Sequence, residues 1–107
     1  MSDYQLTDLA QRDLEEIVDY IAGKLNNPDG AQVVLDYLYQ AMEDIGERPS
    51  RGHARPDLTD RPVRFYRKSR AQKYYLIFDP STRPVIILRI ASVRRDFLGL
   101  LEEKAQS

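Results

Sequence analysis

The sequence predicts an α+β fold in which a helical hairpin packs on a small, mainly antiparallel four-stranded sheet. Two observations support this fold class. Apolar residues recur at three- and four-residue spacings up to about residue 48, which is the period of an amphipathic helix. After residue 62 they alternate with a period of two, as in strands. The expected order is strand, helix, helix, three strands and a short C-terminal helix or tail, in one domain over residues 1–107.

A short strand and the first helix are expected at the N-terminal end. Residues 4–6 alternate in polarity and fit an edge strand. Asp8 suits the N-cap position of the helix, and Gln11 three residues later completes a capping box. The apolar stripe of this helix consists of Leu14, Ile17, Val18, Ile21 and Leu25.

The second helix is expected to follow at once. Asn27 is a good N-cap, and Pro28 fits the first helical position, where its missing N–H costs nothing. Gly46 and Pro49 mark the end of the helix. Its apolar stripe consists of Val33, Val34, Tyr37, Leu38, Ala41, Met42 and Ile45.

Three strands are expected after a polar loop at residues 50–62. Residues 63–68 alternate in polarity, and residues 74–78 form an apolar run. A proline-containing turn at residues 79–84 joins the second of these strands to the third as an antiparallel hairpin. In the third strand, residues 85–90, both the odd and the even positions are mostly apolar. We therefore expect this strand to be central and covered on most of both faces. Arg89 within it is expected to pair with an acid of the helical hairpin.

The charge is divided sharply between the two halves of the chain. Residues 1–50 hold 3 basic and 11 acidic residues, whereas residues 51–107 hold 13 basic and 6 acidic residues. The net charge of −1 hides this division. Such asymmetry predicts an interaction surface on the basic half, facing nucleic acid, an acidic protein partner or the chain's own acidic half.

The composition argues against several classes of protein. There is no Cys and only one His, so no metal site is expected, and nothing suggests a cofactor. His53 lies in a polar loop and reads as a solvated residue rather than a general base. The N-terminus lacks the pattern of a signal peptide, and the apolar runs are too short to span a membrane. We therefore expect a cytoplasmic protein.

Four segments carry motifs that occur together in one superfamily. The helix segment 13–22 has the pattern D-L-x-x-I-x-x-Y-I-A, and residues 48–52 fit a P-x-x-G loop. The strand 74–78 is similar to Y-L-I-x-Y, and residues 89–96 are similar to R-I-x-H-x-x-R-D, with Leu100 and Leu101 following. In this order the motifs resemble the RelE/ParE toxins of type II toxin–antitoxin systems.

The resemblance implies a toxin whose partner is an antitoxin that wraps it with a partly disordered C-terminal segment. It also implies one of two activities. RelE-like toxins cleave mRNA in the ribosomal A site, and ParE-like toxins inhibit DNA gyrase. Arg95 matches the family's Arg after the last strand. However, Tyr75 occupies the position of the RelE-like strand Arg, and Leu101 falls on or near that of the C-terminal Tyr.

These departures favour a ParE-like toxin that inhibits DNA gyrase by binding it, as plasmid-stabilisation toxins do, rather than an enzyme. The alternatives are a RelE-like ribosome-dependent mRNA endonuclease, for which Arg95 would be the catalytic candidate, and a non-toxic binding protein of the same fold. Basic residues that interleave with Tyr could form a polyanion surface, or could only protect a strand edge from self-pairing. The candidate target- or antitoxin-binding residues are Arg64, Tyr66, Arg67, Lys68, Arg70, Lys73, Tyr75, Arg94, Arg95, Leu100 and Leu101.

Overall fold

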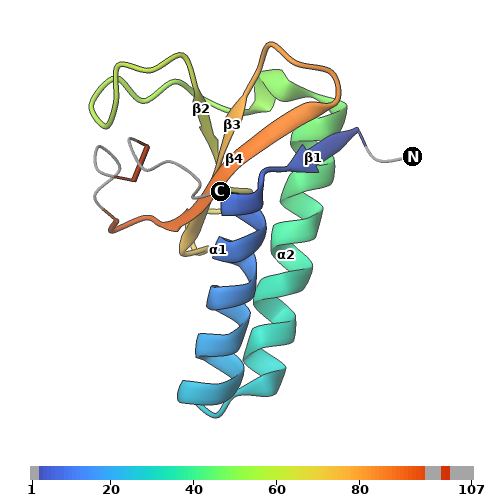
Figure 1. Ribbon diagram of the computed structural model, residues 1–107, viewed down its shortest axis with the longest axis vertical. Helices are drawn as coiled ribbons and strands as arrows, with labels where there is room; N and C mark the ends of the chain where they lie inside the picture. Colours follow the sequence, from blue (N-terminus) through green and yellow to red (C-terminus); the bar gives the residue numbers. More distant parts are fainter. Residues whose placement is uncertain (1–2, 96–99, 102–107) are drawn as a thin grey trace.

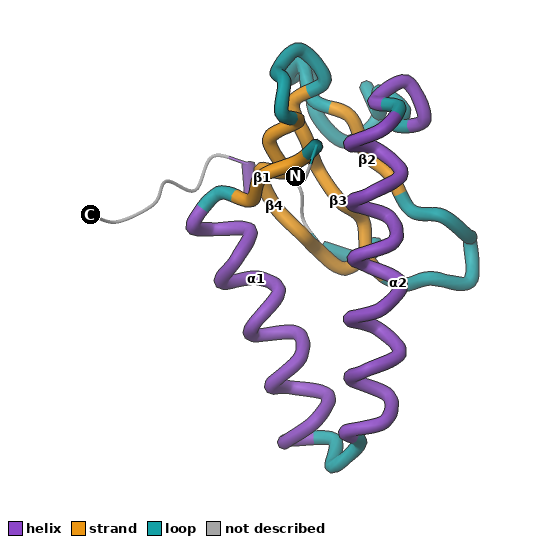
Figure 2. The backbone as a smooth tube through the Cα atoms, turned by 90° about the vertical axis from the view of Figure 1, so that its right-hand side faces the viewer, coloured by secondary structure: helices purple, strands orange, loops and turns teal. Residues whose placement is uncertain are grey.

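The computed structural model of the chain describes residues 3–95 and 100–101. Two helices pack on a four-stranded mixed sheet, which confirms the expected fold class (Figure 1). The helices lie side by side and extend well past the sheet at their connected end, as two perpendicular views show (Figure 2). The elements are β1 (Tyr4–Leu6), α1 (Asp8–Asp19), α2 (Pro28–Glu47), β2 (Arg64–Tyr66), β3 (Tyr74–Asp79) and β4 (Val85–Ser92).

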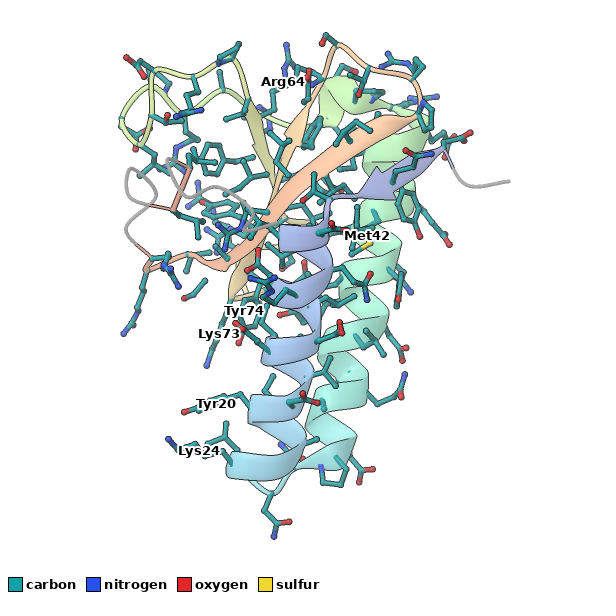
Figure 3. All side chains as sticks on the ribbon, in the orientation of Figure 1. Tyr20, Lys24, Met42, Arg64, Lys73 and Tyr74 are labelled. Carbon is teal, nitrogen blue, oxygen red and sulfur yellow. The ribbon has the colours of Figure 1, made fainter. Side chains whose placement is uncertain are left out.

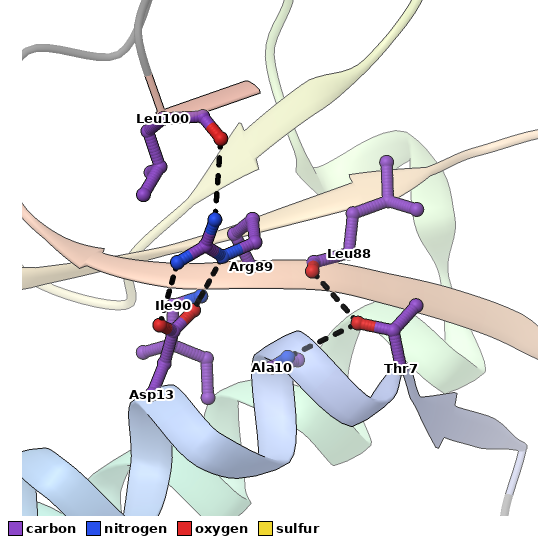
Figure 4. Close-up of polar contacts among 7 residues, drawn as sticks. All are labelled: Thr7, Ala10, Asp13, Leu88, Arg89, Ile90 and Leu100. Carbon is purple, nitrogen blue, oxygen red and sulfur yellow. Dashed lines mark hydrogen bonds and ion pairs between the residues drawn. The ribbon is translucent and has the colours of Figure 1, made fainter. Parts of the chain in front are cut away.

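The cap of α1 differs from the sequence prediction. Thr7, not Asp8, is the N-cap: its Oγ1 accepts a hydrogen bond from the Ala10 N–H at 3.0 Å. The same hydroxyl donates to the Leu88 carbonyl of β4 at 2.8 Å, so the cap also ties the helix to the sheet (Figure 4). Asp8 becomes the first helical residue, where its negative charge is favourable near the helix N-terminus.

The second helix begins at the predicted residue and ends at Glu47, between the two residues that were expected to mark its end. Asn27 accepts a hydrogen bond from the Gly30 N–H at 2.9 Å, and Pro28 is the first helical residue. Gly46 does not end the helix; the C-cap is Arg48. Gly46 is buried, and a Cβ there would lie 3.1 Å from the Cβ of Asp3. We conclude that Gly46 lets the N-terminal strand approach α2 closely.

The strand order is β1-β4-β3-β2, with β1 parallel to β4 and the other two pairs antiparallel. This order confirms that β4 is central. β2 is shorter than predicted, and β4 runs on to Ser92. A bulge interrupts the β3–β4 ladder between Ile77 and Phe78. At the outer edge of β2, Phe65 exchanges two 2.9 Å hydrogen bonds with His53, so the loop pairs with the strand there.

Each face of the sheet carries its own apolar cluster. The first cluster joins both helices to the sheet and contains Ala10, Leu14, Leu38, Ala41, Met42, Ile45, Leu76, Phe78, Val85, Ile87 and Ile90. The second lies on the opposite face and contains Val63, Phe65, Tyr75, Ile77, Ala91 and Leu100. The predicted C-terminal helix or tail falls mostly on residues 96–99 and 102–107, outside the described residues. No described helix is long and apolar enough to cross a membrane.

Arg89 joins β4 to α1 through a buried ion pair, as predicted (Figure 4). Its Nε and Nη2 each donate to the Asp13 carboxylate at 2.8 Å. The same carboxylate accepts the Ile90 N–H at 3.0 Å, and Arg89 Nη1 donates to the Leu100 carbonyl at 3.2 Å. One carboxylate therefore holds the helix, the central strand and, through Arg89, the C-terminal residues together.

A candidate cationic binding surface

A cationic hollow of about 530 Å³ lies on the sheet face that carries the second apolar cluster. β2, β3 and the loops beside them supply its walls. Among the described residues, those that line it include no carboxylate; they are His53, Arg55, Phe65, Arg67, Lys68, Ser69, Arg70 and Tyr75. The hollow is therefore suited to a group that carries negative charge.

Tyr75 is a buried residue that lines the hollow. Its ring packs edge-to-face on Phe65, with the centroids 5.6 Å apart and the planes at 85°. The guanidinium carbon of Arg67 lies 5.0 Å from the ring centroid and that of Arg55 lies 5.9 Å from it, distances at which a cation is attracted to an aromatic ring. Arg55 Nη1 also donates to the Tyr75 hydroxyl at 2.8 Å. The tyrosine thus positions two cations.

Arg55 is also paired with a carboxylate of its own loop. Its Nε donates to Asp57 Oδ1 at 2.9 Å and its Nη2 donates to Oδ2 at 2.7 Å, the two-pronged geometry of arginine–carboxylate recognition. These hydrogen bonds are the main reason that the pKa of Asp57 is lowered. The same bonds raise the pKa of the Arg55 guanidinium above its ordinary value.

The loop between β2 and β3, residues 67–73, is held by its own polar groups. Arg67 Nη1 donates to the carbonyls of Arg70 and Gln72, at 3.1 and 2.9 Å. The Gln72 side-chain oxygen accepts the Lys68 N–H at 3.1 Å. The loop therefore has a defined shape, with the side chains of Lys68 and Arg70 exposed at the rim of the hollow.

The structure divides the predicted binding residues among several places. Arg67, Lys68, Arg70 and Tyr75 meet in the cationic hollow. Arg64 lies at the other end of β2, where its Nη1 donates to the Gly52 carbonyl at 3.2 Å (Figure 3).

The remaining predicted residues line other parts of the surface. Lys73 is exposed and comes directly before Tyr74, the first residue of β3 (Figure 3). Arg94 and Arg95 are exposed after β4, and Arg95 lines a hollow of about 210 Å³ between β4 and α1. Leu100 and Leu101 line a hollow of about 420 Å³ with Val63 and Leu88.

Four residues of the cationic hollow were not among the predicted binding residues. His53 is exposed, as predicted, but it lines the hollow as well. Arg55, Phe65 and Ser69 were also missed. For Arg55, the Arg-Pro-Asp sequence of residues 55–57 was the available signal, because a proline between an arginine and an acid favours a tight local turn.

Tyr66 belongs to the opposite face of the sheet. Its hydroxyl donates to Asp44 Oδ2 of α2 at 2.9 Å, and Arg51 Nη1 lies 3.1 Å from the other oxygen of this carboxylate. Burial, followed by the hydrogen bond to Asp44, raises the pKa of Tyr66 to about 12. Tyr66 therefore links β2 to α2.

We expect Tyr66 to make the fold sensitive to alkali. In the unfolded chain it ionises with a pKa of about 10, and in the folded protein the pKa is about 12. Its contribution to the free energy of unfolding is thus complete below pH 10 and is lost as the pH rises to 12. Urea unfolding of the wild type and of Tyr66→Phe at pH 8 to 12 measures this contribution. A parallel decline in both proteins would contradict it.

Comparisons with protein families and with solved structures both found proteins that are similar to this chain. The sequence profile of the family described as "ParE toxin of type II toxin-antitoxin system, parDE" matches residues 4–97. A solved structure titled "Chromosomal ParDE TA system from P. aeruginosa" contains a chain with the same fold, with a TM-score of 0.69 and 22% sequence identity. The match covers 88% of this chain and 98% of that one. No curated protein sequence is significantly similar to the chain.

Proposed function

We propose, since the chain belongs to the ParE toxin family of type II toxin–antitoxin systems, that it inhibits DNA gyrase in the cytoplasm and is neutralised by a cognate antitoxin. The family match over residues 4–97 carries this proposal. Inhibition of this kind needs only a binding surface. The basic half of the chain offers one, with cations on the hollow, on the loop 67–73 and after β4.

The chemistry of the hollow supports binding rather than RNA cleavage. Cleavage by attack of a 2′-hydroxyl needs one group that takes a proton and another that gives one. Arginine can stabilise a phosphate, but its guanidinium stays protonated in proteins and so does not transfer protons. The Tyr75 hydroxyl already accepts a hydrogen bond from Arg55 and lies in a buried side chain. In the part of the chain that the structure describes, no carboxylate lines the hollow to assist His53.

The test compares the two possible targets directly. Purified protein at stoichiometric concentration is expected to stop gyrase from supercoiling a relaxed plasmid. In a second reaction, ribosomes carrying mRNA are mixed with the protein and the 5′ ends of the mRNA are mapped, and no new ends are expected. Discrete, codon-dependent cuts together with active gyrase would overturn the proposal in favour of an endonuclease.

The arginines after β4 provide a first test of the surface. Replacing Arg94 and Arg95 with Ala is expected to weaken gyrase inhibition roughly tenfold, because truncating an arginine that anchors an interface costs about 1–2 kcal/mol. Both side chains are exposed, so the melting temperature should be unchanged. Arg83→Ala is the matched control, since this exposed arginine donates to the Pro80 and Thr82 carbonyls of its own turn. Equal inhibition by both variants would remove Arg94 and Arg95 from the surface.

A further inference from the structure

We infer that Arg55 is a carboxylate-binding site whose internal occupant, Asp57, is displaced by an acidic segment of a protein partner. The identity of that partner as the antitoxin rests on the proposed function; the site itself rests on the geometry of the hollow. Arg55 points its Nη1 at Tyr75 and its Nε and Nη2 at Asp57. The two-pronged side of the guanidinium thus already holds a carboxylate.

Because Arg55 and Asp57 are both accessible to water, replacing Asp57 by another carboxylate costs little free energy. The side chain of Asp57 is 60% exposed and that of Arg55 is 35% exposed. A salt bridge between groups this accessible contributes little to folding, because water competes for both partners. A carboxylate from another chain can therefore replace Asp57 without a large loss of stability, and Asp57 returns to water.

The guanidinium groups are held in place before any partner arrives. The Tyr75 hydroxyl and ring fix Arg55, and Tyr75 itself is buried against Phe65. Backbone carbonyls of the loop 67–73 hold Arg67 above the same ring. A partner then loses little affinity to the ordering of these side chains.

The hollow fits an acidic peptide better than a nucleic acid strand. Single-strand binding relies on bases stacked on exposed aromatic rings. Here the two rings are covered, since Phe65 is 2% exposed and Tyr75 is 9% exposed. The same apolar cluster also borders the hollow of about 420 Å³, which is lined by Val63, Leu88, Leu100 and Leu101 together with the charged residues Asp8, Arg61 and Arg89. A segment that carries both acidic and apolar residues matches the two hollows together.

The test uses three labelled probes and measures fluorescence anisotropy at two salt concentrations. The probes are a twelve-residue peptide of alternating Glu and Ala, the same peptide with Gln in place of Glu, and a twelve-nucleotide oligothymidylate. The Glu peptide is expected to bind more tightly than the other two, and more weakly as the salt concentration rises. Tighter binding of the oligonucleotide would overturn the inference and favour a nucleic acid site.

Two pairs of variants test the role of Asp57. Asp57→Asn is expected to bind the Glu peptide roughly two- to fivefold more tightly, which is the weight of an exposed salt bridge that no longer competes. Asp60→Asn makes the same change of net charge in the same loop and should have a smaller effect. Arg55→Gln should weaken binding roughly tenfold, and Arg55→Lys should not restore it, because lysine lacks the two-pronged geometry.

The outcomes separate this inference from the proposed function. Equal effects of Asp57→Asn and Asp60→Asn would overturn the inference even if the protein inhibits gyrase. Conversely, Asp57→Asn could change peptide binding as expected while gyrase stays active in the presence of the protein. That result would support the carboxylate-binding site and would contradict gyrase as the target. Both acids are exposed, so this pair of variants remains informative even if Arg55→Gln lowers the melting temperature.

Discussion

Replacing Asp13 with Ala is expected to destabilise the fold by about 3–5 kcal/mol, the cost of removing one partner of a buried ion pair. The substitution removes the Asp13 carboxylate from the buried Arg89 guanidinium, and it also removes the acceptor of the Ile90 N–H. Urea unfolding measures the loss. Glu15→Ala is the matched control, because it removes an exposed acid of α1 and should change stability by less than about 0.5 kcal/mol.

The double variant Asp13→Leu/Arg89→Met shows whether the loss of stability comes from the Arg89 charge that no longer has Asp13 beside it. Replacing a whole buried pair by apolar side chains is often neutral, because neither charge then has to be desolvated. We therefore expect the double variant to be more stable than Asp13→Ala alone. A loss below about 1 kcal/mol for Asp13→Ala would show that water or a neighbouring group reaches Arg89.

Replacing Phe78 with Ala is expected to cost about 3–5 kcal/mol, because its ring is fully buried between the sheet and the helices and its removal leaves a cavity. Gly52 lies against the same ring, and a Cβ at Gly52 would overlap the ring atoms Cζ and Cε1. We therefore expect Gly52→Ala to cost about 1–3 kcal/mol in the wild-type background. The backbone of Gly52 is extended, with φ −76° and ψ 162°, so the cost comes from contact and not from strain.

The two substitutions should not be additive. In the Phe78→Ala background the overlapping ring atoms are gone, so a methyl group at Gly52 meets mainly the Cβ of Arg64 at 3.2 Å. The double-mutant cycle is expected to give a favourable coupling of about 1 kcal/mol or more. Thermal or urea unfolding of the four proteins measures it. Strict additivity would mean that the loop at Gly52 moves away from Phe78.

Some residues of the binding surface could be predicted from the sequence around them, whereas others depend on contacts with distant parts of the chain. The basic residues of the loop 67–73 could be picked out from the sequence because they lie close together in the chain. The role of Arg55 could not be predicted from the sequence, because the Tyr75 hydroxyl that orients it lies twenty residues away on another element. The sequence also grouped Tyr66 with Tyr75, whereas the structure places them on opposite faces of the sheet.

The sequence by itself determined the features that depend on local spacing. The helical and strand periods, the Asn27–Pro28 start of α2 and the central place of β4 all follow from which residue types recur nearby. The pairing of Arg89 with an acid of the hairpin was also predictable, since a charge in an apolar strand must find a partner.

Only the tertiary structure decided the features that depend on a second element. Thr7 replaces Asp8 as the cap because its hydroxyl can also reach the Leu88 carbonyl of β4. Gly46 and Gly52 are required by the close approach of Asp3 and Phe78, neither of which is a neighbour in sequence. Such contacts form when distant segments pack at fixed distances, and the residue types along one segment carry no information about those distances.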